Sequence, residues 1–208
     1  MSIFLPGWGA PAALYEPLLP GGWTALEPPT FAASRGVLDV HREWLTGELR
    51  SRRRAVVGGH SMGGALALLV ASTQPELVER LVLFSPAGLP LTKPVRHSVR
   101  DLAAQIREGL YPARTLLAGT AALLRAPLSA LRLAAHVRSL DLRRECARIR
   151  AHRLPVLVVG CTTDSLVRAD QAHDLAGALG AEYLELDAAG GHMWMVRDRV
   201  RFAAVLGS

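Results

Sequence analysis

Short apolar runs alternate with longer segments of helical periodicity along most of this 208-residue chain. Branched and aromatic runs bounded by Gly, Pro or polar residues predict strands, which we expect at residues 3–5, 23–26, 55–57, 81–84, 156–160 and 182–186. Apolar residues at helical spacing predict helices at residues 11–19, 34–50, 64–73, 169–179 and 193–206. This alternation favours right-handed crossovers and an α/β fold: a mainly parallel sheet of about six strands with helices on both faces.

Residues 88–150 interrupt this alternation. Their apolar positions are helical throughout, and Pro94, Pro112 and Pro127 divide the segment into short helices. We therefore expect one α/β core, formed by residues 1–87 and 151–208, with a helical insertion at residues 88–150.

Positive charge is concentrated in the same segment. Residues 88–153 carry a net charge of +9, whereas the rest of the chain carries −3. No aromatic residues alternate with the arginines and no nucleic-acid-binding motif is present, so we expect no nucleic-acid partner. An arginine-rich face is either a solvated surface or a binding face for an acidic partner, since the planar guanidinium binds carboxylates and phosphates in pairs of hydrogen bonds.

The composition also limits which other classes of protein this chain can belong to. No apolar run is long enough to predict a membrane span, and the N-terminus lacks the basic and apolar regions of a signal peptide. Cys146 and Cys161 show no metal-ligand spacing, so a reduced pair in the cytoplasm is expected. The sequence predicts neither a metal ion nor an organic cofactor.

The turn after the predicted strand at 55–57 carries the pattern G-x-S-x-G, from Gly59 to Gly63 around Ser61. Between a strand and a helix this pattern is typical of a nucleophile elbow, a sharp turn that exposes the serine hydroxyl. A phosphate-binding loop is not indicated, because Gly64 rather than lysine follows Gly63. The alternative is a tight turn in which the serine is incidental.

A serine nucleophile needs a base, and the base needs an acid to orient it. Of the seven histidines, His192 alone is predicted to follow a strand at the carboxyl edge of the sheet, where the sites of such sheets lie. Asp164 follows the predicted strand at 156–160 at the same edge, and Asp187 is the best substitute. We predict a Ser61–Asp164–His192 triad, with a helix-capping histidine and a turn-capping aspartate as the alternative roles.

The oxyanion of an acyl-transfer intermediate needs two hydrogen-bond donors. The backbone N–H of Met62, directly after the serine, is the first candidate. The loop after the first strand, Leu5-Pro6-Gly7-Trp8-Gly9, supplies the second, and we assign it to Trp8. A plain turn is the alternative for this loop.

Four motifs together resemble the α/β-hydrolase family over nearly the whole chain. GHSMGG resembles its nucleophile elbow, GCTTDSLV its acid loop, GGHMWM its histidine loop, and LPGWGA its oxyanion loop, with Pro6 where a histidine often stands. The resemblance implies that residues 88–150 form the family's helical cap. It also implies an N-terminally trimmed sheet, because family members usually carry two further strands before the oxyanion loop.

The resemblance also implies an activity. The chain looks most like the carboxylesterases of biotin synthesis, which demethylate a pimeloyl ester on acyl carrier protein, and like related small esterases and thioesterases. We therefore expect a serine hydrolase acting on a small ester or thioester, with an acidic carrier protein as a possible partner at the arginine-rich cap. The alternative is a non-catalytic hydrolase-fold module that binds an acyl group or a protein.

Overall fold

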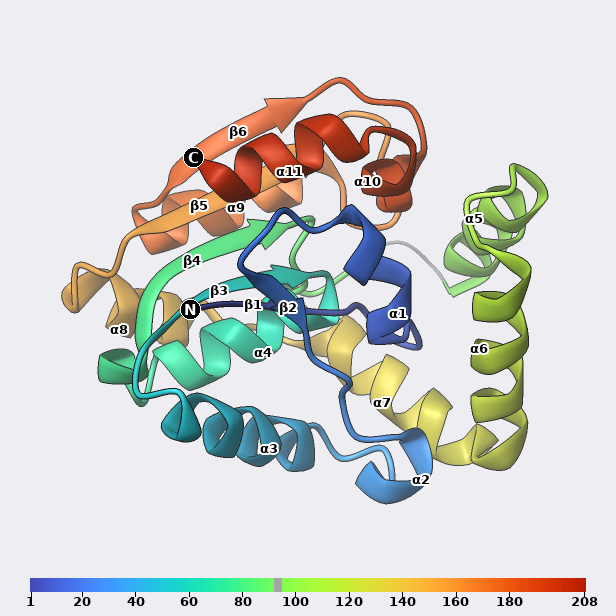
Figure 1. Ribbon diagram of the computed structural model, residues 1–208, viewed down its shortest axis with the longest axis horizontal. Coiled ribbons are helices and arrows are strands. Elements are labelled where there is room, and N and C mark those ends of the chain that lie inside the picture. The colour runs from blue at the N-terminus through green and yellow to red at the C-terminus, as the bar shows by residue number, and fades with distance from the viewer. Residues whose placement is uncertain (92–94) are drawn as a thin grey trace.

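The computed structural model describes residues 1–91 and 95–208, apart from the side chains of residues 95–99, 101 and 114. Its centre is a parallel sheet in the order β2-β1-β3-β4-β5-β6 (Figure 1). The strands are β1 Ser2–Leu5, β2 Trp23–Ala25, β3 Ala55–His60, β4 Val78–Phe84, β5 Val156–Cys161 and β6 Glu182–Leu186. The predicted α/β class and the six strands are confirmed.

The strand order reverses between β1 and β3. From β1 the chain moves outward to β2, and from β3 it moves outward in the other direction to β6. Loops that leave the carboxyl ends of two such strands diverge and open a crevice between them, which is where ligands of open parallel sheets bind. The loop containing Trp8 and the turn containing Ser61 leave from these two strands.

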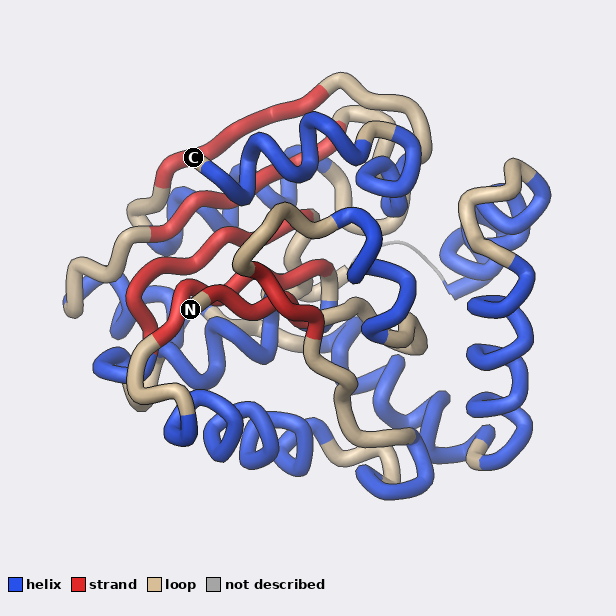
Figure 2. The backbone as a smooth tube through the Cα atoms, viewed as in Figure 1, coloured by secondary structure: helices blue, strands red, loops and turns tan. Residues whose placement is uncertain are grey.

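Helices cover both faces of the sheet (Figure 2). The core-forming helices include α1 Ala12–Tyr15, α3 Leu38–Ser51, α4 Met62–Ala71, α8 Arg143–Ala151, α9 Ala169–Leu179, α10 Trp194–Arg197 and α11 Arg199–Gly207. Side chains alternate along β1: Ile3 and Leu5 pack with α3, α4, α8 and α9, whereas Phe4 packs with α1, α10 and α11. Helix α4 is buried on nearly every side, as its continuous apolar sequence predicts.

The insertion begins with three helices, α5 Val95–Arg107, α6 Ala113–Arg125 and α7 Pro127–Ser139, of which α5 and α6 stand apart from the sheet (Figure 1). The predicted breaks at Pro112 and Pro127 are confirmed, and Pro94 lies outside the described residues. The last helix of the segment, α8, packs beside α9, with Cys146 and Ile149 in the main core. The end of the predicted insertion therefore belongs to the layer on the sheet.

Two predicted helices differ from the structure. The helix expected at 34–50 begins only at Leu38, as α3, because Arg35 and Gly36 take left-handed backbone angles (φ 51° and 73°) and separate it from the short α2, Phe31–Ser34. A Cβ at Gly36 would overlap α7, so the break leaves room for that helix. The helix expected at 193–206 is divided at Asp198, whose carboxylate accepts a hydrogen bond from Arg201 N at 3.1 Å and caps α11.

Among the described residues, no single helix is long and apolar enough to cross a membrane. Thr115–Arg125 and Pro127–Ser139 satisfy the length and composition together, but the pair is bent by 103°.

Candidate active site

Ser61 occupies the sharp turn between β3 and α4. Its backbone angles, φ 52° and ψ −115°, are unusual for a residue with a side chain, and strain of this kind persists only where surrounding contacts enforce it. Its N–H donates to the Phe84 carbonyl at 3.0 Å, and its carbonyl accepts from Ala65 at 3.2 Å and from Ala87 at 3.0 Å. The neighbouring strand and the helix thus hold the strained serine from two sides.

Close backbone packing explains the glycines of the elbow. A Cβ on Gly59 would stand 2.7 Å from the backbone of Gly63, and one on Gly63 would overlap the carbonyl of Leu5 at the end of β1. Any side chain at either position would push α4 away from the sheet. The glycines therefore bring the first turn of α4 against the loop that follows β1.

His192 and Asp164 meet at the carboxyl edge of the sheet. His192 Nδ1 lies 2.7 Å from Asp164 Oδ2, and both residues are buried. Asp164 Oδ1 accepts hydrogen bonds from the N–H groups of Leu166 at 2.9 Å and Val167 at 3.0 Å, so both carboxylate oxygens have partners. Asp187, the substitute acid, instead accepts a hydrogen bond from Thr162 Oγ1 at 2.9 Å.

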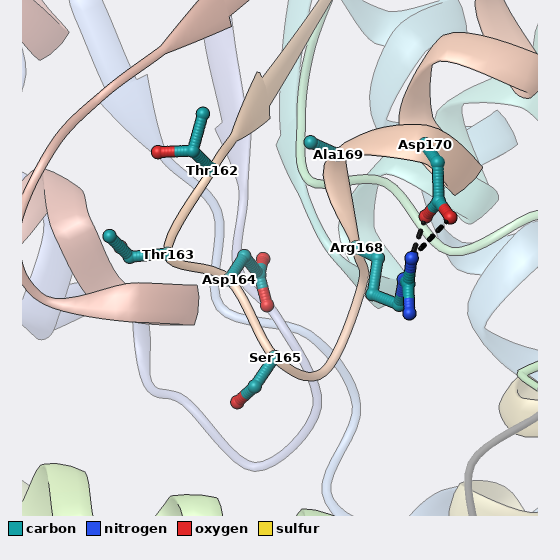
Figure 3. Close-up of a pocket in the computed structure, with 7 residues that line it drawn as sticks. All are labelled: Thr162, Thr163, Asp164, Ser165, Arg168, Ala169 and Asp170. Carbon is teal, nitrogen blue, oxygen red and sulfur yellow. Dashed lines mark hydrogen bonds and ion pairs between the residues drawn. The ribbon is translucent and has the colours of Figure 1, made fainter.

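A pocket lies at the loop that carries Asp164 (Figure 3). This pocket, of about 330 Å³, is lined by Thr162, Thr163, Asp164, Ser165, Arg168, Ala169 and Asp170. All of these belong to one segment, and an ion pair between Arg168 and Asp170, with a shortest distance of 2.7 Å, lies at its margin. None of its lining residues belongs to the nucleophile turn, to the start of α4 or to the loop after β1.

His60 is a site residue that the sequence analysis missed. Its ring is buried, its Nδ1 lies 2.8 Å from Tyr15 Oη, and its Nε2 lies 3.0 Å from the backbone carbonyl of His192. A carbonyl oxygen only accepts, so Nε2 carries the proton and Nδ1 accepts from the tyrosine hydroxyl. Burial, reinforced by the nearby His192, holds the pKa of His60 well below its ordinary value and keeps the ring neutral.

This buried chain links the nucleophile turn to the histidine loop. The rings of His60 and His192 lie 4.5 Å apart between centroids, and His60 directly precedes Ser61. Among the described residues, the hydrogen bonds of the site do not include one from Ser61 Oγ to His192. No spacing pattern in the sequence identifies the hydrogen bond between Tyr15 and His60, because the two residues are 45 positions apart.

The loop after β1 lies against the serine. A Cβ on Gly7 would stand 3.4 Å from the Cβ of Ser61, and the Gly7 carbonyl accepts a hydrogen bond from Ala10 N at 3.2 Å. The Trp8 indole donates to the Ala130 carbonyl of α7 at 3.2 Å, and its ring centroid lies 5.2 Å from that of Phe31. The backbone N–H of Trp8 donates to no other described residue.

Met62 is the first residue of α4. Its N–H has no acceptor within the helix, because the first four amides of a helix lack carbonyl partners. The two predicted oxyanion donors thus lie at the reversal point of the strand order, one on the loop after β1 and one at the start of α4.

A second cavity, of about 120 Å³, opens beside these donors. Its walls come from the loop after β1, the β2–α2 loop, the helices α2, α3 and α4, and the inner side of α6, namely Gly9, Ala10, Pro11, Glu27, Pro28, Pro29, Thr30, Phe31, His41, Met62, Ala118, Gly119 and Ala122. Most of these residues are small or apolar, which is typical of a site for an apolar group.

Within residues 1–91 and 95–208, no group of three or more His, Cys, Asp or Glu residues is arranged to hold a metal ion. The two cysteines are buried and unbridged. Burial raises the pKa of the Cys146 thiol to about 12, which makes it unreactive as a thiolate at neutral pH.

The fold resembles several solved structures closely. An enol-lactonase from Burkholderia xenovorans shares 18% identity, with a TM-score of 0.74, over 99% of this chain and 90% of its own. An esterase from Exiguobacterium antarcticum shares 14% identity (TM-score 0.75; 100% and 91% covered), and a bromoperoxidase from Bacillus anthracis 17% (0.78; 99% and 90%). At these identities the likeness establishes the fold alone.

Sequence comparison identifies the family. No curated protein matches the chain. The model of the alpha/beta hydrolase family matches residues 3–205, which is nearly the whole sequence. With the strand order and the elbow described above, the chain is a member of the alpha/beta hydrolase family.

Proposed function

We propose that this protein is a serine hydrolase that cleaves a carboxylic ester or thioester through an acyl-enzyme on Ser61. The observation that carries the proposal is the buried hydrogen bond between Asp164 and His192. His192 lies on the loop that His60 joins to the strained serine turn. A carboxylate on Nδ1 selects the tautomer whose Nε2 is free to take a proton.

The reaction follows from this arrangement. His192 removes the proton of Ser61 as the hydroxyl oxygen attacks the carbonyl carbon, and then passes the proton to the departing alcohol or thiol. Asp164 stabilises the imidazolium formed between these steps. A water molecule, deprotonated by the same histidine, then attacks the acyl-enzyme, releases the acid and restores the serine.

The proposal includes a hydrogen bond between Ser61 Oγ and His192 that forms when substrate binds. Catalytic hydrogen bonds are often long or misaligned in unliganded enzymes and tighten when substrate binds. The N–H groups of Trp8 and Met62 are proposed to hold the oxyanion, at about 3 kcal/mol of transition-state stabilisation for each donor.

The cavity beside the oxyanion loop supports an apolar acyl group of limited length. Two similar structures, an enol-lactonase and an esterase, favour ester chemistry, since a lactone is a cyclic ester. The resemblance to the carboxylesterases of biotin synthesis adds a finer proposal: an acyl group carried by an acidic carrier protein that binds the basic segment at residues 88–153 through arginines of α8 such as Arg143 and Arg144.

A panel of esters and thioesters of graded acyl length tests the proposal, with wild-type protein compared with Ser61→Ala. We expect the wild type to hydrolyse short-chain members and Ser61→Ala to be inactive. Tight acyl binding by both proteins without turnover would instead identify a binding module.

A further inference from the structure

The outer side of α6 and α7 exposes large apolar side chains. Leu117 and Leu124 on α6 are 72% and 77% exposed, and Leu128 and Leu131 on α7 are 79% and 65% exposed. We call these four residues the leucine face. Elsewhere among the described residues, only Met1 and Val200 are large hydrophobic side chains exposed to this degree.

Helical geometry places the leucine face away from the site. At 100° per residue, Leu117 and Leu124 share one side of α6, and Gly119 and Ala122, which line the cavity, lie on the opposite side. On α7, the buried side consists of Ala130, Leu133 and Val137, and the exposed leucines lie opposite them. The four leucines therefore take no part in the core or in the cavity.

Charge along the same helices has one sign. Residues 109–140 contain four arginines, Arg114, Arg125, Arg132 and Arg138, and no aspartate or glutamate. Both helices thus combine an exposed apolar side with positive charge, the pattern of helices that lie in the interface of an anionic bilayer. A bend of 103° between them excludes a straight span but leaves both helices able to lie along a surface.

We propose that the leucine face docks on an anionic lipid surface. The leucines insert at the boundary between headgroups and acyl chains, and the arginines interact with the lipid phosphates. Because the other side of α6 lines the cavity beside Met62, docking leaves this helix between the cavity and the bilayer. That the substrate is an ester drawn from the bilayer depends on the proposed function, whereas the docking itself does not.

Vesicle flotation tests the docking, using the Ser61→Ala protein and the wild type in parallel. Vesicles of phosphatidylcholine alone are compared with vesicles that also contain phosphatidylglycerol. We expect flotation with the anionic vesicles, weaker flotation at high salt, and little with phosphatidylcholine alone. Equal behaviour of the two proteins separates docking from catalysis.

Matched substitutions locate the surface. Leu124→Glu should lower partitioning onto anionic vesicles at least about tenfold, because it removes an inserted side chain and adds a negative charge. Val200→Glu makes a similar change at a residue that is 78% exposed on α11, outside the insertion, and should float like the parent. Arg125→Gln should reduce the preference for anionic vesicles.

Three results would overturn the proposal. The first is a parent protein that does not float with anionic vesicles. The second is Leu124→Glu and Val200→Glu floating alike. The third is a Leu124-dependent dimer, or a Leu124-dependent complex with acidic acyl carrier protein, in a chain that ignores vesicles, which would assign the leucine face to a protein partner.

Discussion

His60 donates from Nε2 to the backbone carbonyl of His192 at 3.0 Å, across 132 residues of sequence. The bond ties the turn that carries Ser61 to the loop that carries the proposed base. It depends on a neutral His60 with its proton on Nε2, which the hydroxyl of Tyr15 fixes from the other side.

Protonation of His60 should destabilise the fold. Its pKa is held well below the ordinary value of about 6.5 in the folded protein and returns to that value on unfolding. Between the two values the unfolded chain binds the extra proton, so the free energy of unfolding falls as the pH drops below about 6.5, by up to about 1.4 kcal/mol per pH unit. Burial lowers the pKa of His41 as well, and adds to the slope in the same direction.

Urea unfolding between neutral and mildly acidic pH measures this slope. His60→Gln should flatten this slope. His152→Gln is the control, because it replaces an exposed histidine and leaves the buried His60 in place. Equal slopes for the wild type and His60→Gln would contradict the buried neutral ring.

The acid of the proposed triad is tested by two aspartates at the same sheet edge. Asp164→Asn should lower kcat about 10⁴-fold, less than the roughly 10⁶-fold loss expected for Ser61→Ala or His192→Ala. Asp187→Asn should leave kcat close to wild type, because Asp187 contacts Thr162 and not His192. Steady-state hydrolysis of a short ester measures all four, and an inactive Asp187→Asn beside an active Asp164→Asn would reverse the assignment.

Close packing at the elbow predicts opposite effects for two helical glycines. Gly63→Ala should destabilise the protein by about 1–3 kcal/mol or more, because the new methyl group overlaps the Leu5 carbonyl. Gly177→Ala in α9, where no atom lies within 4 Å of the added Cβ, should stabilise it by about 0.5–1 kcal/mol. Urea midpoints at constant m-value report both changes, and a stable Gly63→Ala variant would argue against the tight turn.

Gly119 should control the acyl length that is accepted. A Cβ at this position stands 3.6 Å from the Gly9 carbonyl, so alanine fits, whereas leucine fills the cavity of about 120 Å³. Gly119→Leu should reduce kcat/KM for longer acyl esters relative to acetate, and Gly177→Leu, which changes a helix away from the site, should not. A uniform loss across chain lengths would place the acyl group elsewhere.

Much of the architecture is readable from the sequence because its signals are local. Alternating apolar runs predict all six strands, and the glycines around Ser61 predict the turn. The breaks at Gly36 and Asp198 were missed because the first depends on a close approach by α7 and the second on a cap within a continuous helical pattern.

The candidate site likewise has parts that local sequence signals predict and parts that depend on long-range packing. Asp164 and His192 are predicted from their places after strands, and the structure brings them to 2.7 Å. The connection through Tyr15 and His60 depends on long-range packing and leaves no pattern in the sequence. The place of α8 in the layer on the sheet likewise depends on which apolar side of the helix is buried.

The central claim, that Ser61 is a nucleophile activated by His192, is tested most directly by a fluorophosphonate probe followed by mass spectrometry of the labelled peptide. The account predicts one stoichiometric label on Ser61 in the wild type, none in Ser61→Ala, and strongly slowed labelling in His192→Ala. A folded wild-type protein that is not labelled, or that is labelled equally fast without His192, would contradict it.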